Sequence, residues 1–537
     1  MGQVNAAQVN CSGGLDLVST IQEMFQTPGA ARELINFEPS QTSGYRQLNG
    51  YERFGSQPNG TSPVLGVFPY ADGVVACVGE NIYFSTDGDT WLTMNVSVTD
   101  ALEATLTAAT PIARVNQSKC NFVTYNGNTP YGELIVLDGV NNMWYIKIVG
   151  SGVSREYTCQ EITSGSIKPL WAEVYKERLI VAGDREYPAT MFWSDAYDPT
   201  TFTGGTSGSI KFLDKIECVK VWRDSLFALG RNTISQVGGS FVAGVEPANV
   251  EVKNVSRNIG CISGWSVQEA GGDVLWLAPD GIRTLSGTSK IDDIEMGTIS
   301  RPINPIIQNI IASASTLNIS SLVIRAKNQY RLFYTVEGVA QTEQRGIIGT
   351  FKMGQNGSGW EWAETQGMEV ACSSSWISDS LESTFNTNEV VLHGGYNGYI
   401  YQHDVGNTFD GADITHIYTS PEIDYGDLGT LKSFHWIKLN TKVEGINEDT
   451  TLSVKYDFSD TDTAQPSPYS LPFSEGFSEY GTAVYGVDSY SGVTRKTIKQ
   501  NIEGSGYSNS FTFTIQGSGS PISINGYYIR YYQGRVQ

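Results

Sequence analysis

Histidine is the side chain that most often transfers protons or binds metals near neutral pH, and this chain contains only four. They are His393, His403, His416 and His435. The first two flank the segment 394–402, whose Gly and Asn residues predict a hairpin turn. No H-x-x-x-H or H-x-H spacing, which would bring two imidazoles to one metal, occurs among them. We therefore expect surface or packing histidines and no metal site.

One turn motif stands out, the heptapeptide STDGDTW at residues 85–91. It resembles the Asp-box of sialidase-type propellers, S-x-D-x-G-x-T-W, but is one residue shorter. In that family the Ser and Asp side chains hold the backbone of a hairpin, and the Trp packs beneath it. The motif therefore supports a propeller fold and does not indicate glycan cleavage.

No other spacing singles out a catalytic constellation. A sialidase-like site would need clustered arginines for a carboxylate, together with a tyrosine and an acid, and no pattern places such residues together. The chain contains no G-x-S-x-G elbow, P-loop or nicotinamide fingerprint. We predict no catalytic residues, no cofactor and a protein that is not an enzyme.

Length and composition favour several β-domains. The chain has 537 residues, more than one hydrophobic core normally serves. Charged residues make up only 17%, whereas Gly reaches 58 and Tyr 28. This usage is typical of short strands joined by tight turns. The sequence therefore predicts an all-β protein.

The chain is acidic, with 35 basic and 56 acidic residues and a formal charge of −21. Duplex affinity comes largely from Lys and Arg that neutralise phosphates, so the balance disfavours a DNA-gripping surface. An acidic pore past which DNA slides is compatible with it.

The cysteines and the amino terminus bear on the cellular compartment. The seven cysteines are far apart and include no C-x-x-C pair, so we expect buried free thiols; they are Cys11, Cys77, Cys120, Cys159, Cys218, Cys261 and Cys372. The start MGQVNA resembles no signal peptide, and no run of about 18 apolar residues could span a bilayer. We expect synthesis in a cytoplasm and no membrane-spanning segment.

The chain divides into three regions that differ in their pattern of apolar and turn-forming residues. Residues 1–58 read as an amino-terminal arm with a short helix, because Leu15, Val18, Ile21 and Phe25 have helical spacing. Residues 59–410 repeat strand, turn and strand in units about 40 to 50 residues apart, which predicts a β-propeller of six or seven blades. The candidate units start near Val64, Ile112, Leu170, Ile216, Trp265, Leu322 and Val370. A Ser cap, an early Pro and spaced isoleucines predict a helix over 300–311.

Residues 411–537 read as a carboxy-terminal β-sandwich. Strict alternation at 451–456 and 510–515 predicts half-buried antiparallel strands, and 460–490 predicts an extended loop. The aromatic run Tyr527–Tyr532 is compatible with base stacking, but tyrosine also suits a half-wet sheet. We favour sheet packing, with a subunit interface as the next alternative.

The string ARELINFEPSQTSGYRQLNGYERFG, residues 31–55, resembles the amino-terminal segment of the tail nozzle and hub proteins of short-tailed bacteriophages. Residues 178–183, 192–195 and 198–202 are similar to their propeller blades. Residues 418–426 are similar to the strip that opens their carboxy-terminal β-domain. The likeness spans most of the chain in patches, and the chain is shorter than the largest nozzle proteins.

The resemblance implies a structural virion protein of the tail. It implies a ring, commonly of six copies, below the portal and adaptor proteins and in contact with tail fibres or spikes. DNA would be retained and ejected through its lumen without sequence-specific binding. The alternative is a receptor- or glycan-binding tail protein with a lectin-like propeller, and a glycoside hydrolase ranks below both.

Overall fold

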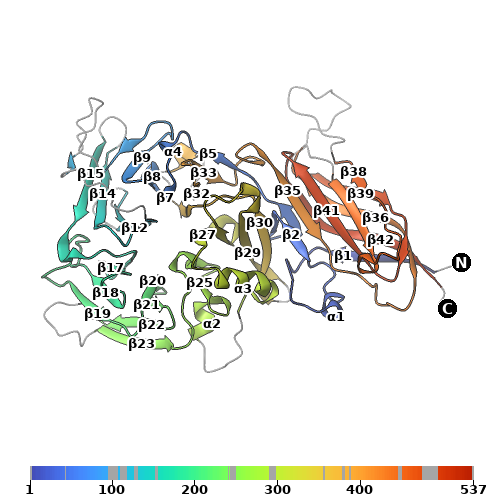
Figure 1. The fold of residues 1–537 in the computed structure, drawn as a ribbon, viewed down its shortest axis with the longest axis horizontal. Helices are drawn as coiled ribbons and strands as arrows, with labels where there is room; N and C mark the ends of the chain where they lie inside the picture. The colour runs from blue at the N-terminus through green and yellow to red at the C-terminus, as the bar shows by residue number, and fades with distance from the viewer. Residues whose placement is uncertain are drawn as a thin grey trace.

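The computed structural model describes residues 3–42, 44–94, 107–108, 118–125, 131–150, 155–239, 241, 250–289, 298–354, 357–377, 381–385, 389–445, 450–473 and 494–534. Antiparallel sheets make up almost all of this part of the chain, so the all-β prediction is confirmed (Figure 1). The α-helices described are short: α1 (Ile21–Met24), α2 (Leu285–Ser289), α3 (Asn304–Ala312) and α4 (Glu382–Phe385).

Five separate sheets follow one another in chain order and form a propeller arrangement (Figure 1). Each is an antiparallel meander, to which one sheet adds a short parallel strand, β11. The first two sheets are β7 (Val64–Tyr70), β8 (Gly73–Val78), β9 (Asn81–Ser85) and β10 (Leu92–Thr93), then β11 (Thr107–Ala108), β12 (Asn121–Tyr125), β13 (Glu133–Leu137), β14 (Met143–Val149) and β15 (Glu156–Ile162). The other three are β16 (Trp171–Tyr175), β17 (Arg178–Ala182), β18 (Thr190–Trp193) and β19 (Gly208–Lys211), then β20 (Ile216–Trp222), β21 (Ser225–Gly230), β22 (Ile234–Gly239) and β23 (Val250–Ser256), and last β24 (Gln268–Ala270), β25 (Asp273–Ala278) and β26 (Gly281–Thr284).

A sixth sheet of fourteen strands follows. One end is a meander of β27 (Asn318–Ile324), β28 (Gln329–Thr335), β29 (Arg345–Gly354) and β30 (Gly357–Gln366). The other end is β31 (Cys372–Ile377), β32 (Glu389–Gly394) and β33 (Ile400–His403), completed by the amino-terminal strand β5 (Tyr51–Arg53). Strands β2 (Glu33–Ile35), β34 (Thr408–Phe409) and β35 (Ala412–Thr419) join the two ends.

The blade count differs from the predicted six or seven, because five sheets stand alone and the remaining strands of 59–410 belong to the fourteen-stranded sheet. The reason is the arm: β2 pairs in parallel with β30 at Ile35 and antiparallel with β35. Hydrogen bonding therefore continues past the edge at which a blade would end. The unit start predicted near Ile112 lies outside the described residues.

The carboxy-terminal strands divide between two sheets. Strands β37 (Thr450–Tyr456), β38 (Tyr469–Leu471) and β41 (Asn509–Gly517) extend the fourteen-stranded sheet from β35. A seven-stranded sheet contains β1 (Gln3–Asn10), β3 (Phe37–Pro39), β4 (Tyr45–Gln47), β36 (Lys432–Val443), β39 (Thr494–Asn501), β40 (Ser505–Gly506) and β42 (Ile522–Gln533). Burial alternates along β37 and β41 as predicted. A separate sandwich over 411–537 is not confirmed, since both sheets include strands of the arm.

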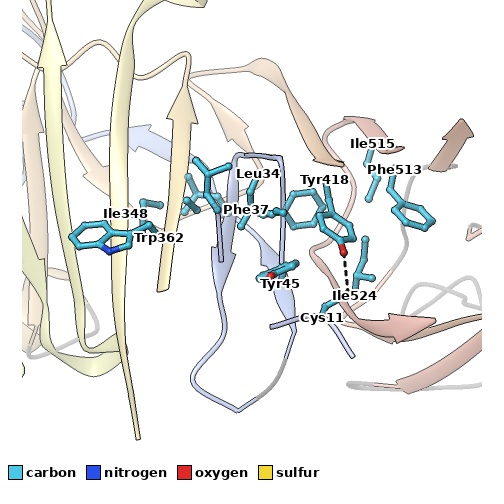
Figure 2. Packing of buried hydrophobic residues seen from close by; sticks show 14 of the residues in the cluster. Cys11, Leu34, Phe37, Tyr45, Ile348, Trp362, Tyr418, Phe513, Ile515 and Ile524 are labelled. Atoms are coloured by element: carbon cyan, nitrogen blue, oxygen red, sulfur yellow. Dashed lines mark hydrogen bonds between the residues drawn. The ribbon is translucent and has the colours of Figure 1, made fainter. Parts of the chain in front are cut away.

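The arm lies within the largest hydrophobic core. Figure 2 shows Leu34 and Phe37 between Trp362 of β30 and Tyr418 of β35. All four side chains are fully buried. The arm thus shares one core with the propeller strands and with the carboxy-terminal strands, which fixes these parts relative to one another.

The helix predicted over 300–311 is present as a short 3-10 turn, Arg301–Ile303, followed by α3. Pro residues occupy the first turn, and Ile307 and Ile310 are buried against the large core. The loop predicted over 460–490 is described only to residue 473, and its remainder lies outside the described residues. No helix among the described residues is long and apolar enough to cross a membrane.

Candidate functional site: the central cavity of the propeller

A cavity of about 320 Å³ lies where the innermost strands of the propeller converge. Each separate sheet contributes residues from its first long strand or from the turn before it, namely β7, β12, β16, β20 and the segment 264–268. The two ends of the fourteen-stranded sheet contribute β27 and β31. The volume is at the lower end of the range for small-molecule sites.

Lys119 carries the one basic group in this cavity that no described carboxylate pairs. Its Nζ donates to Oδ1 of Asn318 at 3.2 Å and to the carbonyl oxygen of Ile319 at 2.8 Å. The same nitrogen lies 4.4 Å from the centre of the Trp265 ring. Burial lowers the pKa of Lys119 to about 7, against a weak opposing effect of Cys372. The amine is therefore partly unprotonated near neutral pH.

Hydroxyl groups form a second polar part of the wall. The Oγ atoms of Ser320 and Ser373 lie 2.6 Å apart, and Ser321 donates its hydroxyl to the carbonyl oxygen of Trp265 at 2.7 Å. Gln268 donates its side-chain amide to the carbonyl oxygen of Ser321 at 3.0 Å. The Ser374 hydroxyl has no hydrogen-bond partner among the described residues. The wall can thus donate to and accept from a small polar molecule.

The remaining charges of the lining are paired. Lys220 donates to Glu173, the only carboxylate among the described lining residues. Burial alone would lower the pKa of Lys220, but the Glu173 carboxylate raises it overall, which favours the charged ammonium form of Lys220. Arg325 lies 3.8 Å from Glu389. Glycoside hydrolysis needs two carboxyl groups flanking the bond, and the described lining supplies one, already paired.

Two of the cysteines in the cavity wall, Cys218 and Cys372, are poor nucleophiles. Burial raises the pKa of Cys218 and of Cys372 to about 12, which keeps both thiols protonated. All seven cysteines are buried and free, as predicted. The described residues contain no group of three His, Cys, Asp or Glu that could hold a metal ion.

The histidines lie away from this cavity. The rings of His393 and His403 are buried 4.5 Å apart and contact Tyr51 and Tyr401. Their ring nitrogens have no hydrogen-bond partner among the described residues. Burial lowers the pKa of both, that of His403 to about 3.

The other two histidines differ from each other in exposure. His416 is buried beside Gln47, and burial lowers its pKa to about 4. His435 lies on the surface near Tyr532. Three of the four histidines are therefore packed and one is exposed, as expected.

The Asp-box-like segment is a structural turn. Ser85 Oγ accepts from the backbone N–H of Gly88 at 2.9 Å, and Asp87 Oδ1 accepts from the N–H of Thr90 at 2.9 Å. The Trp91 indole donates to the carbonyl oxygen of Ser56 at 3.0 Å. A Cβ on Gly55 would lie 2.2 Å from the backbone of Gly88, so only glycine fits there. The motif binds the arm to the first blade.

Sequence reasoning did not find Lys119, Trp265 or the cavity serines. Lysine is usually a surface residue, and the local string around Lys119 carries no motif. Its partner Asn318 lies 199 positions away along the chain. The only sequence signal that bore on this cavity was the repeated strand pattern, whose inner strands line it.

No protein-family model and no curated protein matches the chain. Similar solved structures include the Pan2 WD40 domain of Neurospora crassa, at 10% identity and a TM-score of 0.34, covering 66% of this chain and 96% of that one. Another is YCF48 bound to D1 peptide, at 11% identity and 0.34, covering 66% and 97%. A third is PorZ of the type-IX secretion system of Porphyromonas gingivalis, at 12% identity and 0.33, covering 69% of this chain and 42% of PorZ. These scores carry no activity or partner across to this chain.

Proposed function

We propose that this chain is a non-catalytic structural protein of a phage tail, the building block of a nozzle or hub ring through which DNA is retained and ejected. The resemblance of residues 31–55 to nozzle and hub proteins suggests this role. What supports it in the molecule is how that same segment is held. It is part of the packed interior rather than a free extension.

The observation that carries the proposal is the threading of residues 31–55 through both large sheets. Strand β2 lies between β30 and β35, β4 pairs with β42, and β5 pairs with β33. Asn36, which adopts a positive φ of 55°, donates to the carbonyl oxygens of Gln366 and Thr415 and accepts from the N–H of Gln366. One segment thus joins the propeller to the carboxy-terminal strands, which suits a wall element under mechanical load.

The propeller's own cavity measures about 320 Å³, which is the size of a small-molecule site and not of a DNA channel. A DNA channel built from this chain must therefore be enclosed by several copies around a common axis. Inner strands of the five separate sheets and of both ends of the fourteen-stranded sheet line this cavity.

Labelling of intact particles tests the proposed role. Gold-labelled antibody against the chain should bind at the tail axis, and electron microscopy of the purified chain should show closed rings, expected to be six-fold. Label on capsid facets or fibre tips would refute the nozzle assignment. Deleting the gene should give particles that fail to retain DNA, whereas a fibre or spike deletion should not.

A second candidate is a ligand-binding propeller of a receptor-recognition protein. The observation that favours it is the cavity, where Trp171 and Trp265 meet edge to face with ring centres 4.9 Å apart beside the Lys119 amine and the wall hydroxyls. Aromatic faces with convergent polar groups suit a small hydroxylated ligand. Quenching of tryptophan fluorescence by one member of a glycan panel, lost in Trp265→Ala, together with a trimeric assembly, would favour this candidate over the ring.

A further inference from the structure

The sheet at the end of the molecule that carries both chain termini is basic, although the chain as a whole has a charge of −21 (Figure 1). Strands β1, β36, β39 and β42 contain no Asp or Glu. They contain seven basic residues, Lys432, Lys438, Lys442, Arg495, Lys496, Lys499 and Arg530. Basic residues are therefore concentrated in these four strands, although the whole chain has a net negative charge.

Aromatic side chains share the outer face of this sheet with the cations. In β42, Tyr528 and Tyr532 are 37% and 38% exposed, whereas Tyr527 and Ile529 are buried. Successive residues of a strand point to opposite faces, so Tyr528, Arg530 and Tyr532 share the outer face. The buried partners point to the hydrophobic core.

The strand register places the exposed groups in rows. One row crosses four strands through Gln8, Tyr528, Lys438 and Lys499. The next row contains Arg530, Trp436 and Asn501. Lys499 Nζ lies 5.4 Å from the centre of the Trp436 ring, which links the two rows.

A third row contains Val4, Tyr532 and Ser433, and the ring of the exposed His435 lies 6.0 Å from that of Tyr532. We call the surface formed by the three rows the basic–aromatic face.

A pair of like charges faces each other directly on this sheet, because Lys438 is opposite Lys499. Like charges at directly opposed positions destabilise a sheet. Among the described residues, no carboxylate forms an ion pair with Lys438, Lys499 or Arg530. Such an arrangement should cost stability in the free chain, and an external anion would relieve it.

We propose that the basic–aromatic face binds the phosphodiester backbone of DNA. Lys438, Lys499 and Arg530 neutralise phosphates, and Trp436 and Tyr528 offer ring faces to sugars or unpaired bases. A second copy of this acidic chain is also charge-complementary. However, lysine is depleted at the core of protein interfaces, and this face interleaves lysine with wet polar side chains such as Gln8 and Asn501.

Fluorescence anisotropy with the full chain tests the proposal. The probes are a fluorescein-labelled thymidine oligonucleotide of about 20 nucleotides and a duplex of the same length at low salt. The triple variant Lys438→Ala, Lys499→Ala, Arg530→Ala should weaken binding at least tenfold and flatten the salt dependence by about 2 to 3 in log–log slope. The matched control removes three exposed cations of the propeller, Lys211→Ala, Lys253→Ala and Arg257→Ala. It should bind as the unmodified chain does.

The two probes distinguish stacking on unpaired bases from recognition of the phosphodiester backbone alone. Tighter binding to the single strand, reduced by Trp436→Ala, would show that the rings stack on bases; equal binding would show that the backbone alone is recognised. The absence of binding, or equal losses in the triple variant and the control, would overturn the proposal. So would a triple variant that dissociates an assembly of copies without changing DNA binding. Particle labelling is independent of these outcomes, so failure here leaves the nozzle proposal standing.

Discussion

Glu38 and Arg331 form a buried ion pair, with Oε2 of Glu38 3.3 Å from Nη2 of Arg331. Their side chains are 4% and 0% exposed, and they come from β3 of the arm and β28 of the fourteen-stranded sheet. Lys327 at 2.9 Å and Arg46 at 3.2 Å approach the same carboxylate. Arg331 also contacts Asp404 at 3.0 Å. One acid of the arm thus balances cations from several parts of the chain.

Glu38→Gln should therefore destabilise the protein strongly. The substitution keeps the shape of the side chain but breaks the buried Glu38–Arg331 ion pair, and breaking a buried pair by removing one charge typically costs about 3–5 kcal/mol. Urea unfolding followed by tryptophan fluorescence measures the change. Lys215→Ala, in an ion pair whose lysine is 57% exposed, is the control and should cost less than about 1 kcal/mol. Equal losses of stability in the two variants would show that the buried ion pairs of Glu38 do not stabilise the protein.

The buried histidines should make stability fall in acid. Burial lowers the pKa of His403 to about 3 and lowers that of His393. In the unfolded chain both titrate near 6.5, so below that pH the unfolded state binds protons that the folded state does not. The stabilising contribution is present above about pH 6.5 and is lost as pH falls towards 3. Between pH 6.5 and 5 His403 should account for a loss of about 1.6 kcal/mol, and His393 adds a loss of the same sign.

Replacing the histidines by phenylalanine isolates this effect. The ring nitrogens have no described hydrogen-bond partner, so His393→Phe with His403→Phe removes titration without removing a described hydrogen bond. Urea midpoints of the double variant should change less between pH 7 and pH 5 than those of the unmodified chain. His435→Gln, at an exposed position, is the control for a substitution outside the core. An unaltered slope in the double variant would assign the acid sensitivity to other groups.

Lys119 should also make the stability of the protein rise with pH, in this case in the alkaline range. Its pKa falls from an ordinary value near 10.5 to about 7, so the unfolded state binds more protons between these values. Stability should rise with pH across this window, by at most about 1.4 kcal/mol per pH unit. Lys119→Met should remove the rise, whereas Lys211→Met at an exposed position should retain it. Urea unfolding at pH 7, 8.5 and 10 is the measurement.

The period of the strands could be predicted from the sequence, but their pairing could not. Alternation in β41 correctly indicated a half-buried strand, and Pro302 correctly marked the start of a helical segment. The pairing of β5 with β33 joins residues about 350 positions apart, and local pattern carries no information on such partners. The same limit explains the blade count, since β2 enters the sheet from the arm.

The candidate sites were hidden for related reasons. The pKa of Lys119 depends on burial against Asn318, Ile319 and Trp265, which are distant in sequence. The basic–aromatic face could not be predicted from the overall charge of −21, because a net charge does not show where the cations lie in the fold. Of the tyrosines of 527–532, Tyr527 and Tyr531 pack in the core as predicted, whereas Tyr528 and Tyr532 are exposed.

The Asp-box-like turn offers a local test of the first blade. Asp87→Ala removes an acceptor for the N–H groups of Asp89 and Thr90, at 3.0 and 2.9 Å. The expected loss is about 1 kcal/mol, with a change in the emission of the neighbouring Trp91. Asp89→Ala, in the same turn, keeps both acceptor bonds of Asp87 and should have little effect. Similar losses in both variants would mean that general turn charge, and not the Asp87 hydrogen bonds, stabilises the hairpin.

Relieving the repulsion between Lys438 and Lys499 should raise the stability of the sheet and weaken its binding to DNA. Lys499→Glu places a carboxylate directly opposite Lys438, turning a repulsive cross-strand pair into an attractive one. The unmodified sheet should therefore be less stable than the variant, by about 0.5 kcal/mol. At the same time the variant should lose affinity for the DNA probes, because one phosphate-neutralising charge is reversed. Thr497→Glu, on the same face and opposite Asn440, adds a carboxylate without relieving a like-charge pair and is the control for stability. A Lys499→Glu chain no more stable than the Thr497→Glu chain would show that the Lys438–Lys499 repulsion is already dissipated by solvent.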